Sequence, residues 1–201
     1  MKQTIEFFFD FVSPTTYLAW TQLPGLAQRT GATMKSRPFF LGGVFKATGN
    51  TSPITVPAKH KYLFRDIERY ASHYGVPYRF NPHFPMNTMP LLRAAVSYQL
   101  EGRFDDFVSL MFKAIWERGA NIGDEAEFRS ILQEGGFDAA DFAERIQRPE
   151  AKQGLMANTD EAVKRGAFGA PTFFVGDEMF FGQDRLDMVE LAVRAAAGRP
   201  Q

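Results

Sequence analysis

Strand-type hydrophobic patterns occur only near the two ends of this 201-residue chain, and this placement constrains the fold more than any other sequence feature. Residues 4–11 are aromatic-rich and apolar on both faces, which is typical of a buried central strand, and residues 34–40 indicate a second strand. Between them, Ser13-Pro14 predicts a helix start, because Ser accepts hydrogen bonds from free backbone N–H groups and Pro suits the first helical position. The chain therefore opens β–α–β, which predicts parallel strands joined by a right-handed crossover.

The middle of the chain is predicted to be loop and then helix. The first helix is expected to run to Gly31, with Pro24 bending it or ending it early. Residues 42–57 hold five Gly or Pro residues among several Ser, Thr and Asn residues, so we expect a loop there. Residues 58–150 show helical hydrophobic periods throughout and no convincing strand.

Strand patterns return near the C-terminus. A helix is expected to stop at Gly166, after which residues 172–175 and 179–181 flank Gly176-Asp177, a tight hairpin signal. Asp184 is expected to open a final helix. The order favours an α/β fold in which a four-stranded mixed sheet is interrupted by a large all-helical insertion.

The predicted domain boundaries follow from this order. Residues 1–41 and 151–201 are expected to form the sheet domain, and residues 42–150 the helical insertion with its connecting loop.

Composition excludes several classes of chemistry. The chain has 23 Lys and Arg residues and 23 Asp and Glu residues, so its formal net charge is zero. It therefore has no overall positive potential that would attract nucleic acid or anionic lipid. The first residues are too polar for a signal peptide, and no run of 18 uncharged apolar residues exists, so we expect no membrane span and a cytoplasmic location. The sequence has no Cys, which removes disulfides, thiolate zinc sites and a Cys nucleophile. The three His residues are scattered, and none is predicted to bind a metal.

Three candidate sites each have a structural alternative. Ser13 lies at the carboxyl end of a predicted parallel strand, where open α/β sheets bind ligands, and at a helix start, which would stabilise a bound thiolate. The alternative is that Ser13 only caps the helix. Pro171 could follow a cis bond that exposes the backbone of Ala170 to an extended peptide, or could simply begin a strand. Gln183 and Asp184 could hold a ligand's ammonium group, or Asp184 could cap the last helix.

The long predicted loop and its far end carry three further candidates. Loops of this length are often functional, although the lysines in them are usually solvated. The candidates are Lys46, Asn50 and Lys59.

Taken together, five segments resemble 2-hydroxychromene-2-carboxylate isomerases and the related kappa-class glutathione transferases. The similarity covers essentially the whole chain, and its strength lies in five motifs in order at the family's spacing. They are residues 9–14 (FDFVSP), 46–50 (KATGN), 56–59 (VPAK), 166–171 (GAFGAP) and 181–185 (FGQDR).

The resemblance implies a thioredoxin-like fold with a helical insertion, as in periplasmic disulfide oxidoreductases, together with a glutathione site and a homodimer. Ser13 matches the family's catalytic Ser, whose hydroxyl points at the glutathione sulfur, and Lys46 matches a lysine beside the substrate. The remaining residues match positions that contact glutathione in the family. Pro171 matches the fold's cis-Pro, and the backbone of Ala170 is expected to pair with the cysteinyl part of glutathione. Gln183 and Asp184 match residues that bind the γ-glutamyl end, and Asn50 and Lys59 match further glutathione contacts.

The resemblance favours the isomerase branch, because residues 84–93 (FPMNTMPLLR) are similar to a segment that recurs there. It implies glutathione-dependent interconversion of 2-hydroxychromene-2-carboxylate and trans-o-hydroxybenzylidenepyruvate, with glutathione and a small aromatic carboxylate as partners. A kappa-type transferase and a non-catalytic glutathione-binding module are the alternatives. A disulfide oxidoreductase is excluded because the chain has no Cys.

Overall fold

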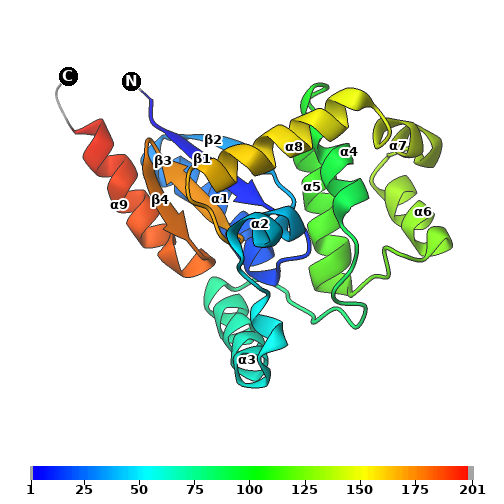
Figure 1. Ribbon diagram of the computed structural model, residues 1–201, viewed down its shortest axis with the longest axis horizontal. Coiled ribbons are helices and arrows are strands. Elements are labelled where there is room, and N and C mark those ends of the chain that lie inside the picture. Colours follow the sequence, from blue (N-terminus) through cyan, green and yellow to red (C-terminus); the bar gives the residue numbers. More distant parts are fainter. Residues whose placement is uncertain (1, 199–201) are drawn as a thin grey trace.

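Four strands form one mixed sheet in the order β2–β1–β3–β4 (Figure 1). The computed structural model describes residues 2–198. Strand β1 (Thr4–Phe9) pairs in parallel with β2 (Thr33–Pro38) and antiparallel with β3 (Thr172–Val175), and β3 pairs antiparallel with β4 (Glu178–Phe181). The predicted mixed sheet, the parallel β–α–β start and the C-terminal hairpin are therefore confirmed.

Helices supply the rest of the regular structure, and most of them lie between β2 and β3 in the chain. Among residues 2–198, no helix combines the length and apolar character needed to cross a lipid bilayer. In chain order the elements are α1 (Pro14–Thr30), α2 (Leu41–Thr48), a 3-10 turn η1 (Pro53–Thr55), α3 (Pro57–Tyr74), α4 (Met89–Gln99), α5 (Phe104–Lys113), a π-helical turn η2 (Ala114–Arg118), α6 (Glu125–Glu134), α7 (Ala139–Arg145), α8 (Pro149–Lys164), a 3-10 turn η3 (Gln183–Arg185) and α9 (Leu186–Ala197).

Strand β1 is buried on both of its faces. Ile5, Phe7 and Phe9 enter a large core that includes side chains of α1, α5 and α9. Phe8 points to the opposite face, into a smaller core with residues of α2 and α8. Alternation along the strand thus sends successive side chains into two cores, as expected for a central strand with helices on either side (Figure 1).

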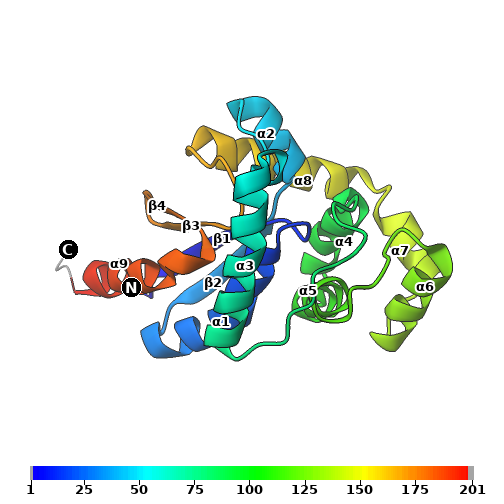
Figure 2. The same ribbon diagram turned by 90° about the horizontal axis from the view of Figure 1, so that it is seen from below.

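The large core continues from the sheet into the helical region. The Phe112 ring on α5 lies 5.8 Å from that of Phe9 and 5.0 Å from that of Phe11, and Phe104 lies 6.1 Å from Phe9. The Trp116 indole N–H donates to the Phe11 carbonyl at 2.8 Å. Helix α3 runs beside α1 (Figure 2). The sheet and the helical region thus share the large core, and the predicted division into a sheet domain and a helical insertion stays a prediction.

The predicted loop over residues 42–57 is wrong in its first half, because α2 occupies part of it. Gly42 and Gly43 form the first turn of α2. A Cβ at Gly43 would lie only 3.3 Å from both the Phe40 ring and the Thr159 methyl group on α8, so Gly permits a close approach of these elements. The helix is stabilised by this packing and by burial of Val44, which composition alone does not reveal.

The expectation that the first helix runs to Gly31 is confirmed, and two other expectations need correction. Helix α1 ends at Thr30 with Gly31 as its C-cap and does not end early at Pro24, because its buried Leu18, Leu23 and Leu26 offset the cost of an internal proline. Residues 75–88, within the stretch expected to be helical, form no helix, and three prolines at positions 77, 82 and 85 disfavour one there. Asp184 does not open α9, which begins at Leu186 after the turn η3.

A buried carboxylate connects three segments around the end of β1. Asp10 is 1% exposed, and its carboxylate accepts hydrogen bonds from the Val12 N–H at 3.1 Å, the Leu41 N–H at 2.9 Å and the Thr88 hydroxyl at 2.5 Å. Burial raises the pKa of Asp10, against the opposing effect of these three hydrogen bonds. The carboxylate thereby holds the starts of α2 and α4 against the turn that leads into α1.

We expect Asp10→Ala to lower the free energy of unfolding by about 2–4 kcal/mol, because it leaves one buried donor and two partly buried donors without their acceptor. Urea denaturation measures this change. Asp160→Ala, which removes an exposed carboxylate on α8, is the control and should change stability by less than about 0.5 kcal/mol. Equal stability of the two variants would show that the Asp10 hydrogen bonds do not hold these segments together.

Candidate active site

Ser13 caps the N-terminus of α1 at the carboxyl end of β1. Its backbone is extended, its Oγ accepts from the Thr16 N–H at 3.3 Å, and Pro14 occupies the first helical position. The predicted cap is therefore confirmed. Ser13 is 8% exposed.

The Ser13 hydroxyl also faces a segment far away in the sequence. Ser13 Oγ lies 3.3 Å from the Ala170 carbonyl oxygen, and Thr15 Oγ1 lies at the same distance from that oxygen. The two hydroxyls share a hydrogen bond of 2.9 Å. The peptide bond between Ala170 and Pro171 is cis. Two hydroxyls at a helix start thus meet one backbone carbonyl from the other end of the chain.

This set of groups suits an anion carried on a peptide. The N-terminus of α1 is the positive end of the helix dipole, which stabilises negative charge. The Ser13 and Thr15 hydroxyls can each donate a hydrogen bond, and the Ala170 backbone borders them. Because the sequence has no Cys, any thiolate at this position must come from a ligand.

The backbone brings Gln183 and Asp184 close to the same loop. The Gly182 N–H donates to the Pro171 carbonyl at 3.0 Å, so the turn η3 begins beside the Ala170 loop. Gln183 is buried, and its carbonyl accepts from the Tyr74 hydroxyl at 2.9 Å. Asp184 makes no cap hydrogen bond and instead pairs with Arg185 at 2.5 Å, so the alternative in which it caps the last helix is wrong.

A surface hollow of about 200 Å³ adjoins this turn. Burial raises the pKa of Tyr74 to about 12, with a further contribution from the neighbouring Tyr70 and the acidic residues at 187 and 184, so the Tyr74 hydroxyl stays protonated. The hollow therefore combines hydroxyl, amide and carboxylate groups able to hold an ammonium group. It is lined by Gln22, Leu26, Arg29, Tyr70, His73, Tyr74, Gln183, Asp184, Leu186 and Asp187.

The predicted residues of the 46–59 region separate into two groups. The Asn50 side-chain N–H donates to the Phe168 carbonyl at 2.8 Å, which ties the segment after α2 to the Ala170 loop. Phe168 in turn packs on Phe181 with ring centres 4.7 Å apart. Lys46, in the last turn of α2, and Lys59, in the first turn of α3, are exposed and make no ion pair within the part of the chain that the structure describes.

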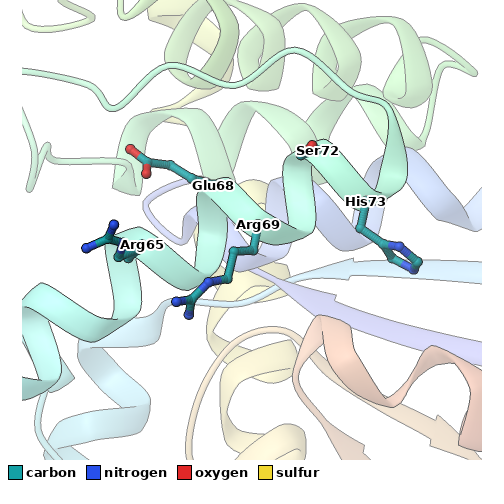
Figure 3. A pocket seen from close by; sticks show the side chains of 5 residues that line it. All are labelled: Arg65, Glu68, Arg69, Ser72 and His73. Carbon is teal, nitrogen blue, oxygen red and sulfur yellow. The ribbon is translucent and has the colours of Figure 1, made fainter.

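Another hollow, of about 510 Å³, lies on the outer side of α3 and contains none of the predicted site residues. Its lining comes from this one helix, and the side chains project outward (Figure 3). An exposed charged helix face of this kind is typical of solvated surface. The lining residues are Arg65, Glu68, Arg69, Ser72 and His73. Residues 2–198 contain no group of three His, Asp or Glu side chains arranged to hold a metal ion.

Two residues of the site were missed by sequence reasoning. Asp10 interrupts a run of four phenylalanines at positions 7, 8, 9 and 11, and an acid within so apolar a run is a signal of a buried, hydrogen-bonded carboxylate. Thr15 gives no comparable signal. Its meeting with Ala170 depends on how the two ends of the chain pack.

Comparisons with known proteins show the family and the fold. Residues 4–194 match the family model described as DSBA-like thioredoxin domain. The 2-hydroxychromene-2-carboxylate isomerase of Sphingobium xenophagum is 36% identical over 192 residues, which cover 94% of this chain and 97% of the relative. Glutathione S-transferase kappa 2 of Caenorhabditis elegans is 26% identical over 203 residues, 94% of this chain and 90% of the relative.

A solved structure gives the same relationship in three dimensions. The structure of a 2-hydroxychromene-2-carboxylate isomerase superposes with a TM-score of 0.85 at 32% identity, covering 96% of both chains. The predicted thioredoxin-like fold is therefore confirmed. With this fold, and with identity above 30% over nearly its full length, the chain belongs to the DsbA-like thioredoxin family and, within it, to the family of 2-hydroxychromene-2-carboxylate isomerases.

Proposed function

We propose that the protein is a glutathione-dependent isomerase that interconverts the cis and trans forms of an aromatic 2-oxo or 2-hydroxy carboxylate, of the 2-hydroxychromene-2-carboxylate type. One observation carries the proposal: in a chain without Cys, the Ser13 hydroxyl lies at the start of α1 and faces the Ala170 carbonyl. The 36% identity to an isomerase of this name supports the reaction class.

When bound, glutathione would supply a thiolate that adds to one carbon of the conjugated double bond, moves its π electrons onto the 2-oxo group so that the remaining single bond rotates, and then leaves as the double bond re-forms. The chain's own task is to keep the ligand's thiol ionised near neutral pH, because a free thiol has a pKa near 8.5. The Ser13 hydroxyl and the N-terminus of α1 together stabilise that negative charge by about 1–3 kcal/mol.

The rest of the tripeptide would be held by groups on both sides of Ser13. Ala170 offers backbone groups to the cysteinyl part, beside Pro171. Gln183 and Asp184, at the edge of the 200 Å³ hollow, would hold the ammonium group of the γ-glutamyl end. Asn50, which is tied to the Ala170 loop, and Lys59 would contact the remaining part of glutathione.

Lys46 would serve the substrate rather than glutathione. Its ammonium group, in the last turn of α2, would balance the substrate's carboxylate or the negative charge that develops on the 2-oxo group. A small aromatic carboxylate in aromatic hydrocarbon catabolism is the substrate class we propose.

The cellular setting belongs to the same proposal. We propose a cytoplasmic homodimer, because glutathione is kept reduced in the cytosol and the resemblance to this family implies a dimer.

Isomerisation of 2-hydroxychromene-2-carboxylate should require added glutathione. We expect the rate without glutathione to fall to that of the uncatalysed reaction, since the chain has no thiol of its own. Absorbance of the substrate, followed with dialysed protein with and without glutathione, measures this. Full activity without glutathione would contradict the mechanism, and net conjugation of chlorodinitrobenzene with no isomerisation would favour a kappa-type transferase instead.

Ser13→Ala should reduce turnover far more than glutathione affinity. We expect kcat to fall by about tenfold or more, with the Kd for glutathione changed by less than about threefold, because the hydroxyl acts on the sulfur. Ser72→Ala, an exposed Ser on α3, is the matched control, and thermal melting checks that loss of the cap leaves the protein folded. If affinity collapsed while turnover of the remaining complex held, Ser13 would be a binding residue only.

Asp184→Ala should weaken glutathione binding by about 5- to 50-fold, because it removes the carboxylate that pairs with the γ-glutamyl ammonium group. Binding of cysteinylglycine, which lacks that group, should not change. Asp160→Ala removes the same charge from an exposed position on α8, away from the hollow, and so distinguishes loss of a specific contact from a general loss of negative charge. Titration calorimetry measures all three affinities, and unchanged glutathione binding would refute this role of Asp184.

A further inference from the structure

The Ser13 hydroxyl has a second hydroxyl beside it that the mechanism above does not use. Thr15 lies in the first turn of α1, partly exposed, with its Oγ1 2.9 Å from Ser13 Oγ. The distance from either hydroxyl to the Ala170 carbonyl is 3.3 Å. Hydroxyl hydrogen bonds are usually 2.7–2.8 Å long, so the contact between Ser13 and Thr15 is the strong one of the three.

The hydrogen bond between the Ser13 and Thr15 hydroxyls can run in either of two directions. In one, Ser13 donates to Thr15, Thr15 donates to Ala170, and Ser13 has no proton left for a ligand. In the other, Thr15 donates to Ser13. Ser13 Oγ then accepts from both the Thr16 N–H and the Thr15 hydroxyl, which fills its two lone pairs and leaves its own proton to be donated outward.

A negative sulfur at the start of α1 would select the second arrangement. An anion is the stronger acceptor for the Ser13 proton, and a hydroxyl that donates to an anion becomes in turn a better acceptor for its neighbour. We infer that Thr15 is a positioning residue that donates to Ser13 Oγ, fixes Ser13 as a donor, and so strengthens stabilisation of a ligand's thiolate. This inference rests on the proposed function, because it acts through Ser13 on bound glutathione.

The test is the pKa of the thiol of bound glutathione, measured by titrating thiolate ultraviolet absorbance in the complex, together with kcat as a function of pH. Thr15→Val keeps the shape of the side chain and removes the hydroxyl. We expect it to raise the bound thiol pKa by about 0.5–1 unit and to lower kcat at neutral pH by about 3- to 10-fold, with little change in KM. Thr15→Ser should restore both values.

Matched variants separate this role from packing. Thr21→Val removes a hydroxyl further along α1 that donates to the Leu18 carbonyl, and it should leave the thiol pKa unchanged. If Thr15→Val has the wild-type thiol pKa, the proposal is refuted. Equal losses in Thr15→Val and Thr15→Ser would also refute it, because the methyl group and not the hydroxyl would then matter.

Ser13→Ala in the same titration distinguishes this proposal from the proposed function. If Ser13→Ala raises the bound thiol pKa and Thr15→Val does not, only the role of Thr15 fails. If Ser13→Ala leaves that pKa unchanged, or if glutathione does not bind, the proposed function fails and the role of Thr15 fails with it.

Discussion

Burial of β1 on both faces is the constraint on which the rest of the structure depends. Phe7 and Phe9 enter the core that extends through α5, and Phe8 enters the core formed with α2 and α8. Each alternate side chain therefore requires helices on its own side of the sheet. Because the strand is fixed from both sides, its carboxyl end is a rigid position from which Asp10 and the turn into α1 can be held.

The candidate site is assembled where the two ends of the chain meet at that position. Ser13 and Thr15 come from the start of α1, and Ala170 comes from the loop before β3, more than 150 residues later. Pairing of β1 with β3 brings these segments together. The chain has a DsbA-like thioredoxin fold and no Cys. In the proposed mechanism, therefore, a ligand supplies the sulfur, and the chain supplies the hydrogen bonds and the electrostatic environment around it.

Local pattern predicted the elements whose signals lie within a few residues. The aromatic run of β1, the Ser13-Pro14 helix start and the Gly176-Asp177 hairpin were all predicted correctly, because capping and turn chemistry act locally. The failure at α2 has a tertiary cause. Burial against distant segments outweighs an unfavourable local composition there, and no sequence window contains the partner that provides it.

The sequence by itself determined the mixed α/β class, the absence of a protein thiol and, through family motifs, the positions of the candidate residues. Only the tertiary structure decided which of these meet. Ser13 and Asn50 both lie against the loop that contains Ala170. Lys46 and Lys59 are exposed. The structure also adds Thr15 and Asp10, to which no motif had assigned a role. The physical reason is that a hydrogen bond depends on distances of about 3 Å, which are set by the packing of segments far apart in the chain.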